Sequence, residues 1–200
     1  MAMASWANAS PNSGSGNGSV NISSKTTNTG RAPRGTTAAF KAAGVMDENV
    51  SVLQAGKPEF IDVQDTASAA QGGATVTIPG MSNSGKLTFT LGTGSLAIAL
   101  PANYLANSVT TPNGAAIAGD PGGSAEFPFS LQVVVPENAG VEELARQIVV
   151  TDEAGNTDVC TITQAAGEPT LEVSHSTVEL DWQGTPVTVT VTSNTNWTVE

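Results

Sequence analysis

The sequence has a single cysteine, Cys160, and a single histidine, His175. One cysteine excludes an internal disulfide, so we expect the fold to be stabilised by packing or by assembly. One histidine excludes a multi-histidine metal site and a nucleophile assisted by a second histidine base. Glycine-rich runs lack the lysine and the following helix that a phosphate loop needs. We therefore expect no cofactor and no enzymatic activity.

Basic residues are also scarce. Seven lysines and arginines stand against 18 aspartates and glutamates, for a formal net charge of −11. Such a charge repels phosphate backbones, so we expect no nucleic-acid binding. No apolar run approaches the roughly 20 residues that span a bilayer, and residues 1–19 lack a basic start followed by an apolar stretch. We therefore expect no membrane insertion and synthesis in a cytoplasm, a history that suits a virion component.

Aromatic residues make up only 4% of the chain. Sugar binding by a β-sandwich normally uses two or three exposed rings, because pyranose faces stack on them. Trp182 and Tyr104 are the candidates for a glycan contact. For Trp6 and Trp197 we favour packing in or beside a core, since large aromatics are usually highly buried.

What the chain does contain in abundance is Gly, Ser, Thr, Ala, Asn and Val, a composition that favours strands and turns over long helices. Apolar and polar residues alternate in four short runs, 73–78, 87–91, 159–163 and 185–191. Turn residues separate the runs, as at Asn113 and Gly114. One helical turn is expected at Val141–Gln147. The pattern predicts an all-β fold of short strands.

An internal repeat is the clearest signal in the sequence. Gln54, Ala55 and the alternating residues before them match Gln164, Ala165 and their predecessors at an offset of 110 residues. A second block matches at an offset of 111 and pairs Val76, Ile78, Ser82 and Asn83 with Val187, Val189, Ser193 and Asn194. A third, weaker block places Val20, Ile22 and Asn28 against the run from Leu131 to Asn138.

These offsets define a unit of about 110 residues, the size of an immunoglobulin-like sandwich. We predict tandem immunoglobulin-like β-sandwich modules, with a complete copy at residues 58–168. Residues 1–57 resemble the later strands of a module and residues 169–200 its first strands. The two parts either complete one module within the chain, complete one between chains, or continue in a longer chain. The candidate assembly strand contains Val187, Val189, Val191 and Trp197.

The terminal segments resemble the BACON domain, an immunoglobulin-like family common in Bacteroidetes. Ser193, Asn194 and Trp197 match the family's opening strand. The later part of its pattern is matched by Trp6, Ser10, Pro11, Ser13, Gly14, Ser15, Gly16, Asn17, Gly18, Val20, Ile22, Asn28, Arg34, Gly35, Val52, Gln54, Ala55 and Gly56. Residues 79–130 depart from the family, with long Gly- and Ala-rich connections and no tryptophan.

The resemblance implies two settings, because BACON modules occur on carbohydrate-active enzymes at cell surfaces and in structural proteins of crAss-like phages. We expect a non-enzymatic bacteriophage virion protein, a head fibre or an auxiliary capsid (decoration) protein. Its expected partners are capsid or other virion proteins, further copies of itself as a homo-oligomer, and a host surface glycan. The alternative is a carbohydrate-binding module at the surface of a Bacteroidetes cell.

An acidic group surrounds Gly155 and is formed by Asp152, Glu153, Asn156 and Asp158. Closely spaced oxygens of this kind bind calcium in some loops, but the spacing matches no EF-hand. We favour a solvated hairpin turn, because the matching segment at Asp47–Asn49 is also polar.

Overall fold

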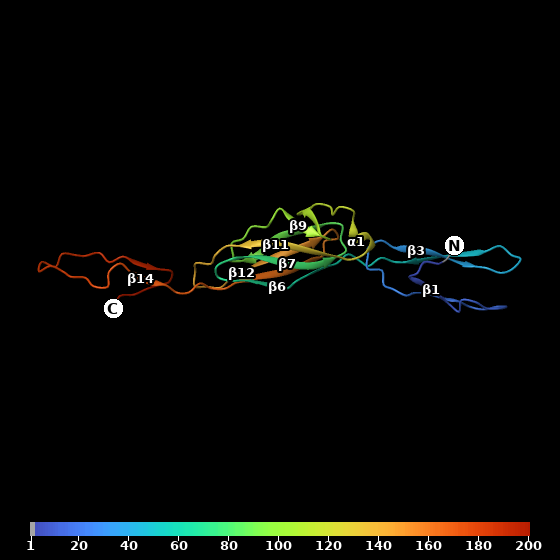
Figure 1. Cartoon of the computed structure of the whole chain (residues 1–200), viewed down its shortest axis with the longest axis horizontal. Helices are drawn as coiled ribbons and strands as arrows, with labels where there is room; N and C mark the ends of the chain where they lie inside the picture. Colours follow the sequence, from blue (N-terminus) through green and yellow to red (C-terminus); the bar gives the residue numbers. More distant parts are fainter. Residues whose placement is uncertain (1–2) are drawn as a thin grey trace.

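A computed structural model describes residues 3–200 and shows an elongated molecule with three parts in a row (Figure 1). A two-sheet sandwich lies in the middle, two hairpins from the N-terminal segment extend from one end, and a hairpin from the C-terminal segment extends from the other. The described residues form 15 strands and one helix of four residues. The predicted all-β character is confirmed. Among these residues no helix is long and apolar enough to cross a membrane.

The central sandwich contains nine strands in two sheets. One sheet has the order β10-β9-β11-β7-β5 and the other the order β6-β13-β12-β8. Their bounds are β5 (Ile61–Val63), β6 (Thr66–Ala69), β7 (Ala74–Ser82), β8 (Leu87–Gly94), β9 (Asn103–Ala106), β10 (Val109–Pro112), β11 (Phe127–Val135), β12 (Leu144–Asp152) and β13 (Thr157–Gln164). All pairings are antiparallel except that of β13 with β6.

Alternation along the strands builds the core between the two sheets. In β11, every second residue from Phe127 to Val135 is buried and the residues between them are more exposed. Val76 and Ile78 of β7 face the same layer, and Ile148 and Ile162 meet them from the other sheet. Each strand thus buries one face, which is the arrangement that a period of two predicts.

The helical turn expected at Val141–Gln147 is wrong. Strand β12 begins at Leu144, whose backbone is paired with Gln164 of β13. Pairing with β13 along eight positions outweighs the helix propensity of a short run such as Glu142 to Leu144. The one helix among the described residues, α1 (Pro121–Ser124), lies instead between β10 and β11.

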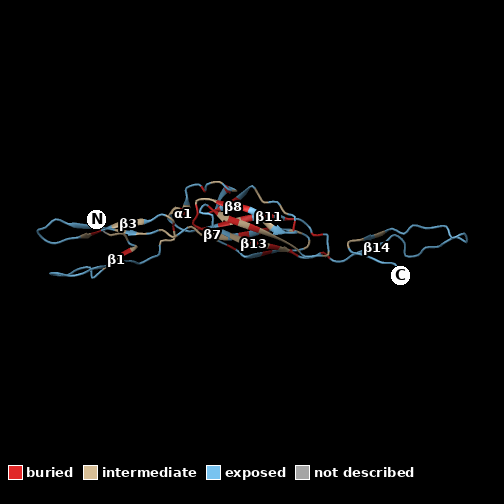
Figure 2. Ribbon diagram, turned by 180° about the vertical axis from the view of Figure 1, so that it is seen from behind, coloured by how far each residue is buried: buried red, intermediate tan, exposed pale blue. Residues whose placement is uncertain are grey.

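The N-terminal segment forms two separate hairpins. Strand β1 (Ala7–Ser10) pairs with β2 (Asn21–Ser24), and β3 (Arg34–Phe40) pairs with β4 (Glu48–Gln54). At the opposite end, β14 (Leu171–Val173) pairs with β15 (Val191–Ser193). Buried residues concentrate in the central sandwich, and the terminal hairpins are largely exposed (Figure 2).

The terminal hairpins repeat the pairing registers of the sandwich. Arg34 faces Gln54 across β3 and β4, and Leu144 faces Gln164 across β12 and β13, each shifted by the sequence offset of 110. Likewise β14 and β15 join Leu171 to Ser193, as β5 and β7 join Ile61 to Ser82. The N-terminal segment therefore repeats the pairing of β12 with β13, and the C-terminal segment repeats the pairing of β5 with β7.

Candidate assembly surfaces

Equivalent asparagines make equivalent hydrogen bonds at the two joints of the molecule. The Asn83 side chain accepts from Phe60 N at 3.1 Å and donates through Nδ2 to Lys57 O at 3.2 Å. The Asn194 side chain accepts from Thr170 N at 2.8 Å and donates to Glu168 O at 2.9 Å. Each asparagine holds the segment that enters its module.

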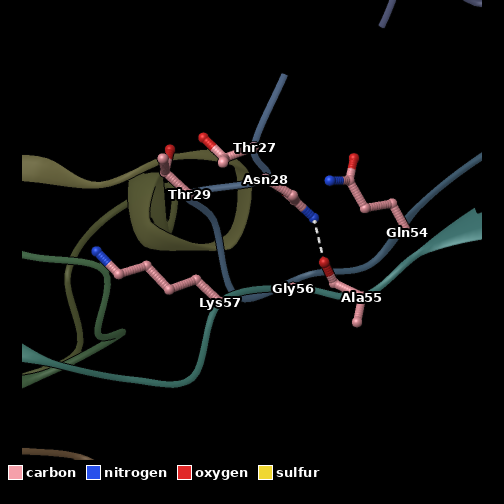
Figure 3. A pocket seen from close by; sticks show the side chains of 7 residues that line it. All are labelled: Thr27, Asn28, Thr29, Gln54, Ala55, Gly56 and Lys57. Atoms are coloured by element: carbon pink, nitrogen blue, oxygen red, sulfur yellow. Dashed lines mark hydrogen bonds between the residues drawn. The ribbon is translucent and has the colours of Figure 1, made fainter. Parts of the chain in front are cut away.

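A second pair of asparagines holds the segment that leaves each module. Asn28 Nδ2 donates to Ala55 O at 3.2 Å (Figure 3), and Asn138 Nδ2 donates to Ala165 O at 3.0 Å. Beyond them, the Lys57 amide donates to Gly30 O and the Gly167 amide donates to Gly140 O. The two joints are thus built to one plan, with partners displaced by 110 or 111 residues.

The two copies differ in what covers their glutamine. Gln164 is fully buried, and its Nε2 lies within hydrogen-bond distance of Pro136 O at 2.6 Å, Gln71 O at 3.3 Å and Ala70 O at 3.4 Å. The matching Gln54 keeps the counterpart of the first contact, to Thr26 O at 3.2 Å. The side that Ala70 and Gln71 occupy in the central copy is open at Gln54.

This open side is a shallow hollow of about 430 Å³ in the N-terminal segment (Figure 3). Figure 3 shows its lining residues, which come from the segment before β3, from the last residue of β4 and from the segment after β4: Thr27, Asn28, Thr29, Gln54, Ala55, Gly56 and Lys57. Its lining residues are small or polar, apart from the long side chain of Lys57. Backbone carbonyls and amides of this lining suit a peptide segment as ligand.

The N-terminal hairpins expose residues that a complete module buries. Val50 is 45% exposed, while Cys160, its counterpart on β13, is fully buried. Phe40 on β3 is similarly exposed, whereas its counterpart Val150 on β12 is buried. The hairpins β1–β2 and β3–β4 extend apart from the sandwich (Figure 1), and each is a two-stranded sheet with free edges. Half a core is therefore open to solvent.

The candidate assembly strand is exposed in the same way. Val187 is 45% exposed and Val189 is 39% exposed, whereas their counterparts Val76 and Ile78 belong to the central core. Val191 lies in β15 opposite Val173, and Trp197 is about half exposed. Residues 168–190 are all exposed.

The structure does not bring Trp197 to Trp6. The two terminal segments lie at opposite ends of the central sandwich (Figure 1). The Arg34 guanidinium lies over the Trp6 ring at 4.8 Å from its centroid, and the ring is half-buried in this position. Of the arrangements that the sequence leaves open, this chain does not show completion of the split module by its own two ends.

The two candidate glycan contacts lie in different environments. Trp182 is 92% exposed, on a turn where the Asp181 carboxylate accepts from Thr185 N at 2.9 Å and Thr185 Oγ1 at 2.7 Å. These hydrogen bonds lower the pKa of Asp181. Tyr104 is only 3% exposed and packs on Phe89 at 4.8 Å between ring centroids. Burial raises its pKa to about 12, and its ring faces the core rather than solvent.

The acidic group at Gly155 forms a hydrogen-bonded turn. Asp152 accepts from Asn156 N at 2.8 Å and from Asn156 Nδ2 at 2.7 Å. Asp158 accepts from Val63 N at 2.7 Å and so ties the hairpin to β5. In residues 3–200, no group of three or more His, Cys, Asp or Glu side chains is placed to hold a metal ion.

One functional feature is missing from the sequence-based predictions. Arg31, in the segment before β3, contacts three places on the central sandwich: its guanidinium lies 2.6 Å from Asp120, 3.5 Å from Glu59 and 3.3 Å from the Asn83 carbonyl. The hydrogen bond to Asp120 is the main cause of its raised pKa. These partners are distant from Arg31 in the sequence, so no local sequence pattern predicts the contact.

No protein-family model matches the chain, and no curated protein matches its sequence. The BACON resemblance and the roles it implies therefore stay predictions.

Proposed function

We propose that this chain is a non-enzymatic structural protein that assembles through immunoglobulin-like modules. The observation that carries the proposal is the exposure of half a sandwich core at each end of an elongated molecule. Unpaired strand edges beside exposed apolar residues associate with other strands unless they are covered. A molecule with such ends is suited to joining neighbours.

Strand order supports the immunoglobulin-like assignment of the central module. In constant-type immunoglobulin domains one sheet has the order A-B-E-D and the other the order C-F-G. Here β5, β7, β11 and β9 lie side by side in one sheet, and β8, β12 and β13 in the other. The extra strand β6 pairs parallel to β13. This order agrees with β5 as A, β7 as B, β8 as C, β9 as D, β11 as E, β12 as F and β13 as G.

The specific role that we propose is a component of a bacteriophage virion, a head fibre or auxiliary capsid protein. The resemblance of both terminal segments to BACON modules of phage structural proteins supports this setting, and a rod with an adhesive surface at each end suits a fibre. The proposed partners are capsid or other virion proteins and further copies of the chain.

Purified particles of the phage that encodes the chain test this role. Mass spectrometry should find the protein at a fixed copy number per particle, and labelled antibody should mark the capsid surface in electron micrographs. A protein that is abundant in infected cells but absent from purified particles contradicts the role. Antibody binding to uninfected cells would place the protein at a bacterial surface instead.

Trp182 supports one second candidate, a carbohydrate-binding module at a cell surface or on the host-facing part of a virion. Its ring is almost fully exposed on a turn held by Asp181, and an exposed indole is the usual platform for a pyranose face. A glycan array probed with the native chain and with Trp182→Ala tests this. Binding that the substitution weakens at least about tenfold supports a platform, since an aromatic contact contributes about 1–3 kcal/mol.

A further inference from the structure

We propose that residues 177–180 of one copy add as a strand to the free edge of β4 in a second copy, with the turn at Asp181 and Trp182 seated in the hollow beside Gln54. This inference rests on the assembly part of the proposed function and names the partner as a second copy of this chain. It assigns a ligand to the hollow that Figure 3 shows.

The central module supplies the template for the contact. There β6 adds to the edge of β13, parallel to it, with Thr66 opposite Thr161 and Ala69 opposite Gln164. The Ala165 amide donates to Ala69 O at 3.2 Å and extends this ladder by one bond. In the N-terminal segment, β4 is the counterpart of β13, and its edge away from β3 pairs with no other strand among residues 3–200. The same chain thus shows which element belongs there.

Residues 177–180 are the counterpart of β6. The turn after β6 closes with a hydrogen bond from Gly73 N to Ala70 O, and the turn after residue 180 closes with one from Gly184 N to Asp181 O. Both glycines have a positive φ, 83° for Gly73 and 70° for Gly184. This match places Val178 and Leu180 at the inward positions of Ala67 and Ala69, yet both are exposed in the single chain.

In the central module, the turn after β6 lies where the repeat places the counterpart of this hollow. Gln71 occupies that space, where its carbonyl accepts from Asn138 N at 2.8 Å and its Nε2 donates to Asn138 O at 2.9 Å. Asn28, the counterpart of Asn138, lines the hollow, and its backbone amide donates no hydrogen bond to any backbone carbonyl within residues 3–200. Trp182 is the counterpart of Gln71, so its carbonyl would accept from Asn28 N.

The hairpin β1–β2 of the acceptor copy would gain a second strand from the same donor copy. In the central sheet, Ile78 of β7 lies opposite Leu131 of β11, and Val76 lies opposite Val133. The offset of 111 places Val187 opposite Ile22 of β2 and Val189 opposite Val20, the residue before β2, along the edge of β2 that β1 leaves free within residues 3–200. One C-terminal segment thus supplies strands to both open hairpins and covers exposed residues such as Val50.

The geometry of the molecule makes this contact a head-to-tail one. Donor and acceptor surfaces lie at opposite ends of the rod (Figure 1), so each added copy presents a new open end. Contacts between two different surfaces of identical subunits form open filaments or closed rings, according to the angle between subunits. The inference therefore assigns the molecule a linear or annular assembly and no isologous dimer interface.

Disulfide formation between introduced cysteines tests the predicted strand register directly. In a Cys160→Val background, the Ser51→Cys variant and the Thr177→Cys variant are mixed, because these residues are the counterparts of Thr161 and Thr66. Both side chains are exposed, and neighbouring strands place their Cα atoms within disulfide reach. Thr93→Cys, exposed on the central sandwich, replaces Ser51→Cys in the control mixture. We expect the mixed disulfide to form about tenfold faster or more with Ser51→Cys.

Equal rates in the two mixtures overturn the inference. So does an intrachain disulfide in a diluted double variant, which would show completion within one copy. Hydrogen exchange of the unsubstituted chain is an independent test that needs no variant. The Ala55 amide should exchange more slowly as protein concentration rises. An unchanged exchange rate contradicts the contact. Presence of the protein in virions does not depend on these results, so the virion role and the strand contact fail separately.

Discussion

The guanidinium of Arg31 lies 2.6 Å from the carboxylate of Asp120, and this ion pair fixes the N-terminal hairpins to the central sandwich. Two backbone hydrogen bonds support it, from Arg31 N to Gly122 O and from Ala32 N to Gly123 O, each 2.9 Å long. Specific contacts, rather than a flexible linker, therefore connect the N-terminal hairpins to the central sandwich. A rigid joint keeps an open end in a fixed direction, as an assembling rod requires.

Replacing Arg31 with methionine should loosen this joint without unfolding the sandwich. Asp120 is half exposed, so the stability cost should be only about 1 kcal/mol. Small-angle X-ray scattering should show a broader distribution of distances within the molecule. The Lys41→Met variant, which loses an exposed ion pair with Asp47 at the far end of a hairpin, is the matched control. Identical scattering from both variants would contradict a structural role for Arg31.

Gly122 of α1 should not tolerate a side chain. A Cβ atom added there would lie 2.0 Å from the Asn83 carbonyl oxygen, so the backbone of one partner must move. We expect Gly122→Ala to lower the free energy of unfolding by about 2 kcal/mol or more, measured by urea denaturation. Gly72→Ala, where the added atom meets nothing within 4 Å, should change it by less than about 0.5 kcal/mol.

The equivalent residues Asn83 and Asn194 should contribute different amounts to the free energy of unfolding. Asn83 is fully buried, and alanine at this position leaves the Lys57 and Pro58 carbonyls without its Nδ2 donor. We expect Asn83→Ala to cost about 2–3 kcal/mol. Asn194→Ala should cost less than about 1 kcal/mol in isolated chains, because the C-terminal hairpin is open to water. If Asn194→Ala costs as much at concentrations where chains associate, burial of its joint accompanies assembly.

Stability should fall at alkaline pH. Burial raises the pKa of Cys160 to about 11, helped by the charges of Asp65 and Asp158, and burial raises that of Tyr104 to about 12. Each group keeps its proton longer in the folded chain than in the unfolded chain, so the stabilisation is complete below about pH 9 and declines as pH rises towards 12. Cys160→Val, which copies Val50, should reduce the decline between pH 9 and 11 in thermal scans. An unchanged decline would show that Cys160 does not contribute.

Local patterns predicted the parts of the molecule that depend on local chemistry. Alternation at Val76 and Ile78 predicted the core face of β7. The helical turn at Val141–Gln147 failed because pairing with a distant strand outweighs local propensity. The environment of Tyr104 followed from the contact of its ring with Phe89, which lies on a strand of the other sheet and has no signal near Tyr104 in the sequence.

The hollow beside Gln54 was equally inaccessible to sequence reading. The repeat shows that Gln54 and Gln164 are counterparts, but only the structure shows that one is covered and the other open. The difference arises because Ala70 and Gln71 precede Gln164 in the same module, whereas their counterparts lie at the opposite end of the chain from Gln54. An incomplete module thus becomes recognisable through the complete one beside it.

Sedimentation velocity of the 200-residue chain over a range of concentrations tests the central claim most directly. We expect species larger than one chain that grow with concentration, and a shift to single chains when Val187 and Val189 are both replaced by aspartate, since charges at inward positions cannot be buried without partners. Thr188→Asp, which lies between the two valines and on the opposite face of the strand that we propose they form, should leave the assembly intact. A folded single chain at every concentration, or equal assembly by all variants, would contradict association through the open modules.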